Sequence, residues 1–134
     1  MIYYKKRHER GEDMHTNESA EMYLECILEL KNQHGEVRSI DIARKTGYSK
    51  PSVSRAVGLL KKSCYIEVDA NGYITLTKSG LNIAEKIFER HSLISEFLVR
   101  LGVTPEVAAE DACKIEHVIS DESFAKIKDF AGKI

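Results

Sequence analysis

Residues 39–62, SIDIARKTGYSKPSVSRAVGLLKK, predict two short helices joined by a tight turn. Ser39 can cap the first helix, and Gly47 can end it because glycine readily adopts the left-handed backbone conformation found after helices. Ser49 can cap the second helix, and Pro51 lies in its first turn, where a missing amide hydrogen breaks no helical hydrogen bond. Two short helices separated by a glycine-containing turn predict a helix-turn-helix.

The segment that follows, residues 65–76, has the pattern of a β-hairpin. Two runs of β-prone residues, 65–68 and 73–76, flank the sequence Asp-Ala-Asn-Gly. An Asn-Gly pair favours the tight turns that join antiparallel strands. We therefore predict a hairpin here that forms the wing of a winged helix.

The remaining sequence predicts further helices on both sides of this region. Apolar residues at helical spacing predict a helix over residues 17–32. Later patterns predict a helix from about residue 78 to 93 that continues to Gly102, one from Pro105 to about Ile119 and one from Asp121 to Phe130. We expect residues 1–15 to form a disordered basic arm. The predicted fold class is mainly α with a small β-hairpin, divided into a winged helix-turn-helix DNA-binding domain over 16–78 and a helical domain over 79–134.

Charge is unevenly distributed, although the 134 residues have a formal net charge of −1. Residues 38–62 carry seven basic side chains and one acid, Asp41, which makes this segment a candidate footprint for DNA phosphates. The second helix of a helix-turn-helix places its N-terminal part in the major groove, so polar residues near Ser49 are expected to meet the bases. The predicted DNA-binding residues are Arg38, Ser49, Lys50, Pro51, Ser52, Ser54 and Arg55.

The chemistry of these residues suggests a role for each. Arg55 can donate two hydrogen bonds to a guanine, Lys50 can contact a phosphate, and Pro51 can touch a thymine methyl group. Ser52 and Ser54 can each reach a base edge or a phosphate. The alternative is an exposed helix with ordinary solvated charges, and it stays open for each residue taken singly.

The composition argues against several classes of protein. Three widely spaced cysteines, Cys26, Cys64 and Cys113, fit neither a disulfide framework nor a paired-cysteine zinc site, so we expect reduced thiols. No apolar run approaches the roughly 18 residues that cross a bilayer, and no signal peptide is evident, so we expect a cytoplasmic protein. We expect no enzyme, because no motif combines a general base with an open metal position. A metal-dependent hydrolase and a protein-interaction module are the alternatives from other classes.

Four side chains that can bind transition metals lie off the apolar faces of their predicted helices. At about 100° per residue, Met22 falls on the acidic side of helix 17–32, away from the core. Cys113, Glu116 and His117, at positions i, i+3 and i+4, project together from a later helix. These four chemistries suit a first-row divalent ion better than Ca²⁺ or Mg²⁺. Taken separately, each residue also has an ordinary explanation, as an interface methionine, a buried thiol or a solvated surface side chain.

Three motifs resemble those of the diphtheria-toxin-repressor and manganese-transport-regulator family of metal-dependent repressors. Residues 21–24, EMYL, resemble the first-helix metal motif, and residues 49–54, SKPSVS, resemble the start of the recognition helix. Residues 113–121, CKIEHVISD, resemble the ligand helix and are the most specific of the three. The resemblance implies a winged-helix domain followed by a helical metal-binding and dimerisation domain. It further implies a homodimeric repressor of metal-uptake genes that binds a palindromic operator with Fe²⁺ or Mn²⁺ as corepressor.

The same resemblance implies a set of metal ligands. His91, whose apolar stripe alone suggests a core histidine, matches a family ligand position, and Glu25 matches a carboxylate ligand of the manganese-type members. Glu96 or Glu110 could supply a carboxylate to a second site. The implied ligands of the primary site are Met22, Cys113, Glu116 and His117, with His91 and Glu25 as further ligands.

The chain also departs from both branches of that family. Ser95 and Ala109 stand where iron-type members have ligands, so we expect an incomplete second site. Met22 and Cys113 stand where manganese-type members have carboxylates, so the primary site is a hybrid. Because the sequence stops after the predicted dimerisation helices, we expect no SH3-like third domain of the kind found in longer iron-type members. The alternative function is a winged-helix regulator that is metal-independent or responds to oxidation of Cys113.

Overall fold

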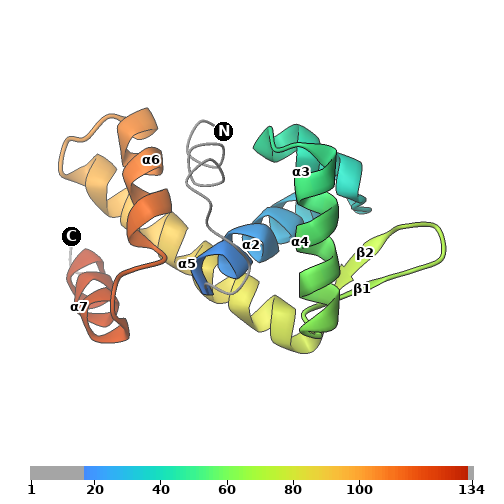
Figure 1. Ribbon diagram of the computed structural model, residues 1–134. Helices are drawn as coiled ribbons and strands as arrows, with labels where there is room; N and C mark the ends of the chain where they lie inside the picture. Colours follow the sequence, from blue (N-terminus) through green and yellow to red (C-terminus); the bar gives the residue numbers. More distant parts are fainter. Residues whose placement is uncertain (1–16, 133–134) are drawn as a thin grey trace. The chain divides into compact units, whose positions relative to one another are not determined.

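The computed structural model describes residues 17–132, so the predicted arm over residues 1–15 lies outside the described part of the chain. The predicted fold class, mainly α with a small antiparallel hairpin, is confirmed (Figure 1). No helix within residues 17–132 has both the length and the apolar character needed to cross a membrane. The elements are α2 (Asn17–His34), α3 (Ser39–Thr46), α4 (Lys50–Lys62), β1 (Ile66–Val68), β2 (Ile74–Leu76), α5 (Lys78–Arg100), α6 (Pro105–Ile115) and α7 (Asp121–Ala131).

The chain divides into two compact units, and the boundary falls inside α5, between Glu85 and Lys86. The start of α5 therefore belongs to the first unit, together with α2, α3, α4 and the hairpin. The rest of α5 belongs to the second unit, with α6 and α7. The domain bounds 16–78 and 79–134 stay a prediction.

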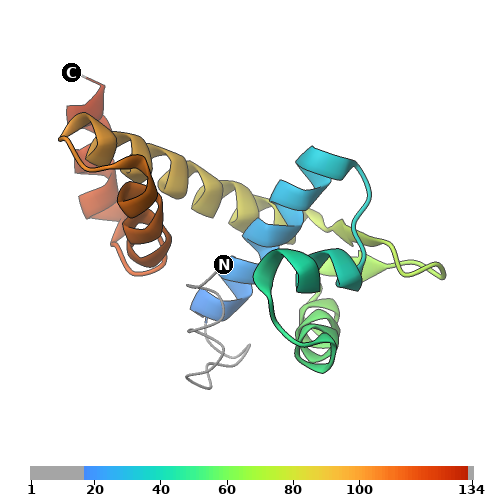
Figure 2. The same ribbon diagram turned by 90° about the horizontal axis from the view of Figure 1, so that it is seen from above.

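α3 and α4 form the predicted helix-turn-helix, and Figure 2, which looks along α4, shows α3 crossing it. The turn begins at Gly47, whose φ of 77° is left-handed and whose amide donates to the carbonyl of Ala43 at 2.9 Å. Ser49 caps α4, because its hydroxyl oxygen accepts the amide of Ser52 at 3.3 Å. The signals that glycine and serine give in the sequence therefore act as expected.

The expected cap of α3 is wrong, because Arg38 and not Ser39 is its N-cap. The carboxylate of Asp41 accepts the backbone amide of Arg38 at 2.8 Å, which fixes the helix start one residue earlier than expected. Just before this cap, the carbonyl of Val37 accepts the amide of Ile74 at 2.7 Å. The start of α3 is thereby attached to β2, the second strand of the hairpin.

The hairpin is closed by a longer loop than a two-residue Asn-Gly turn. The amide of Asp69 donates to the carbonyl of Tyr73, and that of Gly72 donates to the carbonyl of Asp69, both at 3.0 Å. Gly72 alone of these residues has a positive φ, of 85°, as in a turn followed by a glycine bulge. The carboxylate of Asp69 also accepts the amides of Asn71 and Tyr73 at 2.9 Å each. The strands pair in the register Ile66 with Leu76, Glu67 with Thr75 and Val68 with Ile74.

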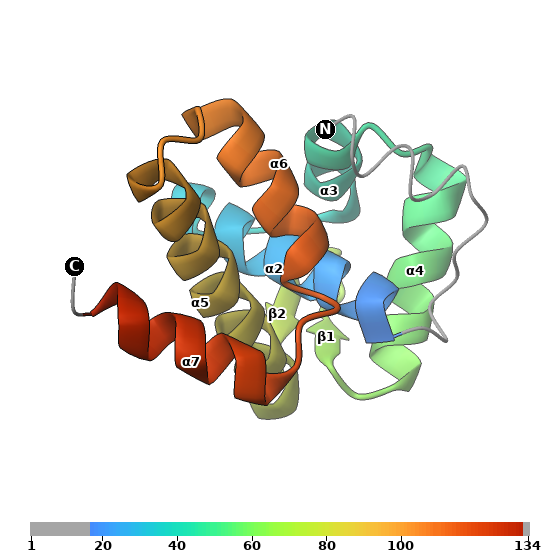
Figure 3. The ribbon, with the colours of Figure 1, turned by 90° about the vertical axis from the view of Figure 1, so that its left-hand side faces the viewer.

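Each unit has its own buried apolar residues. In the first unit, α4 buries one stripe at helical spacing, made of Val53, Ala56, Val57 and Leu60, which leaves its other side exposed. In the second unit, Figure 3 shows α6 and α7 beside the C-terminal half of α5. The core of this unit consists of Ile94, Ala112 and Phe124, with Leu93, Leu98, Ile115 and Ile119 packed against it.

Candidate metal centre and DNA-binding surface

The helix that carries the predicted ligands is shorter than expected. The prediction that it continues to Ile119 is wrong, because α6 ends at Ile115. The amides of Val118 and Ile119 both donate to the carbonyl of Ile115 at 3.0 Å, so the backbone leaves the helix in a turn. Ser120 then caps α7, accepting the amide of Ser123 at 3.0 Å. Residues 116–120 therefore form a turn between α6 and α7.

This turn brings Glu116 to two other predicted ligands, His91 of α5 and Cys113 of α6. The Nδ1 atom of His91 lies 2.8 Å from Oε2 of Glu116 and 3.6 Å from Sγ of Cys113. One donor atom from each of the three residues lies within 4.8 Å of the other two. Glu116 is 0% exposed, and its Oε1 lies 3.2 Å from Nε2 of His117. Four of the six predicted ligands are therefore gathered around one buried carboxylate in the second unit.

The electrostatics of this cluster favour a bound cation. Hydrogen bonds to Cys113 and then to Glu116 raise the pKa of His91 from 6.5 to about 11, against the opposing effect of burial. A protonated imidazole must lose one proton before a ring nitrogen is available as a ligand, so a metal ion at these donors would replace that proton. Sulfur, imidazole and carboxylate donors within a few ångströms of each other fit a first-row divalent ion. The residues present therefore suit the metal that the sequence predicts.

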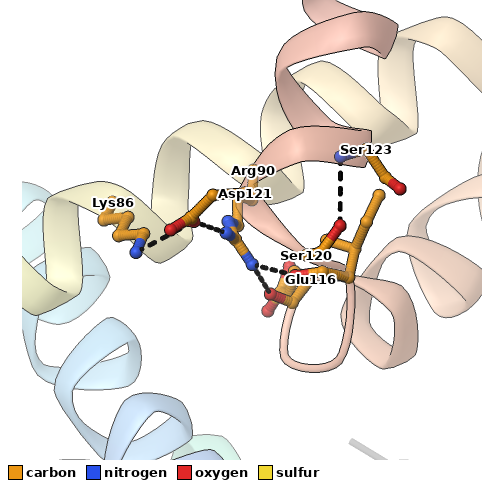
Figure 4. Close-up of polar contacts among 7 residues, drawn as sticks. Lys86, Arg90, Glu116, Ser120, Asp121 and Ser123 are labelled. Carbon is orange, nitrogen blue, oxygen red and sulfur yellow. Dashed lines mark hydrogen bonds and ion pairs between the residues drawn. The ribbon is translucent and has the colours of Figure 1, made fainter.

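Arg90 holds the turn that carries these ligands (Figure 4). Its side chain is buried, and its Nη1 donates to the carbonyls of Glu116, at 3.2 Å, and Ile119, at 2.8 Å. Its Nη2 forms an ion pair with the carboxylate of Asp121, and Nζ of Lys86 lies 3.2 Å from the same carboxylate oxygen. Lys86 and then Arg90 hold the pKa of Asp121 below its usual value.

The two predicted ligands of the first unit, Met22 and Glu25, are 1% and 2% exposed. The expectation that Met22 faces away from the core is wrong, because every residue from Met22 to Leu28 is buried and α2 is enclosed on all sides there. The hydroxyl of Tyr48 donates to Sδ of Met22 at 3.5 Å. The ring of Tyr48 also lies against that of Tyr23, with centroids 6.0 Å apart. Nothing in the sequence pattern singles out Tyr48 for this contact.

The carboxylates suggested for a second site have other surroundings. Oε1 of Glu96 accepts a hydrogen bond from Arg100 at 2.7 Å on an exposed part of α5. Glu110 is exposed on α6. Among residues 17–132, neither belongs to a group of three or more metal-binding side chains. The second site therefore gains no support from the structure.

Most of the predicted DNA-binding residues in and around α4 are exposed. Ser52 is half-buried, and its hydroxyl oxygen accepts a hydrogen bond from the Ser49 hydroxyl at 2.9 Å, so it helps to fix the start of the helix. The exposed members of the predicted set in and around α4 are Ser49, Lys50, Pro51, Ser54 and Arg55. Their exposure at the N-terminal part of the second helix is what entry into a major groove requires.

Arg38 has a different place from the other predicted DNA-binding residues. Its guanidinium carbon lies 4.3 Å from the centroid of the Tyr73 ring, a cation–π contact between the start of α3 and the wing. Its side chain is nevertheless exposed. Arg38 thus supports the wing and keeps a positive charge at the protein surface.

Both halves of the chain match models of one known family. Residues 15–74 match the model described as the N-terminal DNA binding domain of iron dependent repressors. Residues 77–134 match the model described as the metal binding and dimerisation domain of the same repressors. Together the two matches account for nearly the whole sequence.

Named relatives agree with these matches. Transcriptional regulator MntR of Escherichia coli O157:H7 is 34% identical over 121 residues, which are 90% of this chain and 78% of that protein. An HTH-type transcriptional regulator of Methanocaldococcus jannaschii is 34% identical over 119 residues, 87% of this chain and 95% of that protein. The structure of the manganese regulator SloR superposes with a TM-score of 0.75 at 31% identity. It covers 84% of this chain, which spans only 53% of that longer chain. This chain therefore belongs to the iron-dependent repressor family of metal-dependent transcriptional regulators.

Proposed function

We propose that this protein is a cytoplasmic homodimeric repressor of metal-uptake genes, which binds a palindromic operator when Mn²⁺ or Fe²⁺ occupies its metal centre. The observation that carries the proposal is the cluster of His91, Cys113 and Glu116, whose donor atoms lie within 4.8 Å of one another. The same chain presents a helix-turn-helix with Lys50 and Arg55 exposed. The proposal therefore combines a metal centre with a DNA-binding surface in one chain.

Each proposed ligand acts through an ordinary donor atom. Cys113 would provide a thiolate, Glu116 a carboxylate, and His91 and His117 one imidazole nitrogen each. When bound, the ion supplies positive charge that holds these donors together. Met22 and Glu25 remain the ligands predicted from α2. Met22 also contacts Tyr48, the residue directly before the N-cap of α4, Ser49. Metal can favour the DNA-binding arrangement only by binding it more tightly than the alternatives, and α2 is the proposed lever.

Two of the proposed ligands bear on whether the ion is iron or manganese. Thioether and thiolate donors, from Met22 and Cys113, favour iron, because soft ligands hold Mn²⁺ weakly. Manganese is the ion named for the regulator SloR, and iron is named in the matching family models. We propose that whichever of the two ions tightens DNA binding more at equal free concentration is the corepressor.

The test is fluorescence-anisotropy binding to DNA from upstream of the protein's own gene. Binding is compared in chelator, in Mn²⁺ and in anaerobic Fe²⁺, for wild type and for a Cys113→Ala/His117→Ala double variant. Metal is expected to tighten binding of wild type and to leave the double variant unchanged. Lys114→Ala is the matched control, because Lys114 is exposed on the same helix and should respond to metal as wild type does.

Other outcomes have distinct meanings. Operator binding that is indifferent to metal would leave a winged-helix regulator without a metal signal, and oxidation of Cys113 would then be tested next. Absence of any salt-dependent affinity for DNA would remove the regulatory function altogether, because phosphate contacts make such binding depend on salt.

A further inference from the structure

The turn between α6 and α7, residues 116–120, depends on one side chain from another helix. The carbonyls of Glu116 and Ile119 both accept hydrogen bonds from Nη1 of Arg90, at 3.2 and 2.8 Å. These carbonyls lie near the two ends of the turn. Arg90 therefore fixes its beginning and its end relative to α5.

Arg90 is buried more deeply than its ion pair requires. Its side chain is 7% exposed, whereas that of Asp121 is 79% exposed and also has Lys86 as a cationic neighbour. Its Nε has no hydrogen-bond partner among the described residues. Burying a guanidinium has a large desolvation cost, and a surface arginine could pair with Asp121 without that cost. The burial is therefore explained by the backbone carbonyls that Arg90 holds and not by its charge partner.

The position of Arg90 next to His91 gives these contacts a chemical meaning. Arg90 bonds to the backbone carbonyl of Glu116, and the neighbouring His91 bonds to its carboxylate, with Nδ1 at 2.8 Å from Oε2. Two consecutive residues of α5 thus hold both the backbone and the side chain of Glu116. The Arg90 guanidinium also lies 5.4 Å from the ring centroid of Phe124, a residue of α7 in the core of the second unit.

We propose that Arg90 is a positioning residue of the metal centre, which holds the 116–120 turn so that Glu116 meets His91 and Cys113. The inference rests on the proposed function, because it takes this cluster as the site of the ion. Arg90 contributes no donor atom to the metal. Its effect is on the geometry, affinity and selectivity of the site.

Lysine cannot reproduce this arrangement. The planar guanidinium uses one nitrogen for two carbonyls and a second nitrogen for the Asp121 carboxylate. A single ammonium group keeps the charge but cannot hold these separated acceptors in a fixed plane. Arg90→Lys therefore tests the planar, two-nitrogen geometry of the guanidinium, and Arg90→Met tests that geometry together with the positive charge.

The experiment measures Co²⁺ binding to the purified protein by chelator competition, together with the absorption bands of the Co²⁺ complex. These bands report thiolate and carboxylate coordination independently of DNA binding. Arg90→Lys and Arg90→Met are expected to lower Co²⁺ affinity by about 10- to 100-fold and to change the spectrum. Lys86→Met is the matched control, since Lys86 contacts the same Asp121 but does not reach the turn. Its affinity and spectrum should equal those of wild type.

The outcomes separate this inference from the proposed function. If wild type shows no Cys113-dependent Co²⁺ binding, the metal centre itself is wrong. If wild type binds Co²⁺ and both Arg90 variants match its affinity and spectrum, the role of Arg90 is wrong. If circular dichroism shows that both Arg90 variants lose their helices, Arg90→Gln replaces them, because glutamine keeps a side-chain donor but cannot hold both carbonyls and the Asp121 carboxylate. A changed Co²⁺ spectrum in that folded variant supports the role of Arg90, and an unchanged spectrum overturns it.

Discussion

α5 passes very close to the backbone of Tyr65, which lies between α4 and β1. Alanine therefore does not fit at Gly80 without a shift of the backbone. A Cβ atom added there would lie 2.0 Å from the carbonyl oxygen of Tyr65 and 2.9 Å from its carbonyl carbon. Both contacts are with backbone, which cannot rotate away as a side chain can. The same Tyr65 carbonyl accepts the amide of Thr77 at 3.0 Å, so moving it disturbs the junction between the wing and α5.

The expected cost of Gly80→Ala follows from these contacts. Relieving the overlap costs about 1–3 kcal/mol, and losing the hydrogen bond from Thr77 costs about 1 kcal/mol more. Alanine returns about 1 kcal/mol, because it is the better helix former. We therefore expect a net destabilisation of about 1–3 kcal/mol. For a small domain this corresponds to a fall of roughly 5–20 °C in the thermal midpoint.

The assay is thermal and urea unfolding of wild type, Gly80→Ala and a matched control, Gly58→Ala. Gly58 lies within α4, and an added Cβ there would meet nothing within 4 Å. Helix propensity alone then applies, so Gly58→Ala is expected to stabilise the protein by about 0.5–1 kcal/mol. The two substitutions are chemically identical and should have opposite signs. A rise in the thermal midpoint for both variants would refute the packing argument at Gly80.

Three further predictions concern charge and thiol chemistry. Arg55→Ala should weaken operator binding by about 1–3 kcal/mol and relax the preference for one base, whereas Lys50→Ala should weaken binding to all DNA sequences alike and reduce the slope of log affinity against log salt by about 1. Anisotropy titrations at several salt concentrations distinguish the two variants, and identical behaviour contradicts the assignment. Asp121→Asn should lower the thermal midpoint at neutral pH, because neighbouring cations hold the carboxyl pKa below 3.8. That stabilisation is complete above the pKa of Asp121 in the unfolded chain and disappears as pH falls through its pKa in the folded protein, so the thermal midpoints of wild type and variant should converge in strong acid. Equal midpoints at neutral pH contradict the prediction. Burial raises the pKa of Cys26 to about 12, so a thiol reagent should modify exposed Cys64 in the native protein and Cys26 only after unfolding, as mass spectrometry can show.

The helix-turn-helix and the wing could be predicted because their signals are local. Gly47 and Gly72 occupy left-handed positions, and Ser49 caps the helix that follows it. Where two local signals compete, the sequence is less informative. The carboxylate of Asp41 draws the start of α3 back to Arg38, although Ser39 is the better cap by residue type.

The candidate site could be predicted only as a set of residues and not as a geometry. The i, i+3, i+4 spacing predicts that Cys113, Glu116 and His117 lie together, and both Cys113 and His117 do lie near Glu116, yet α6 ends before Glu116. The helical spacing and the early end of α6 do not conflict, because Glu116, the C-cap of α6, keeps a right-handed helical backbone conformation. The role of Arg90 has no signal in the sequence, since an arginine on an amphipathic helix is usually exposed. Its burial becomes evident only once α5, α6 and α7 are packed together.

The hydrogen bond from Tyr48 to Met22 has a consequence for any redesign of the proposed metal centre, in which Met22 is a proposed ligand. Exchanging the Met22 thioether for an aspartate, to favour a harder ion, would also give the phenol of Tyr48 a charged acceptor in place of a neutral sulfur. The phenol would then compete with the ion for the new carboxylate. Because Tyr48 directly precedes Ser49, the N-cap of α4, this competition would also shift the start of α4. Positions 22 and 48 therefore have to be changed together, and sequences that drift from one ion to another should be expected to vary at both.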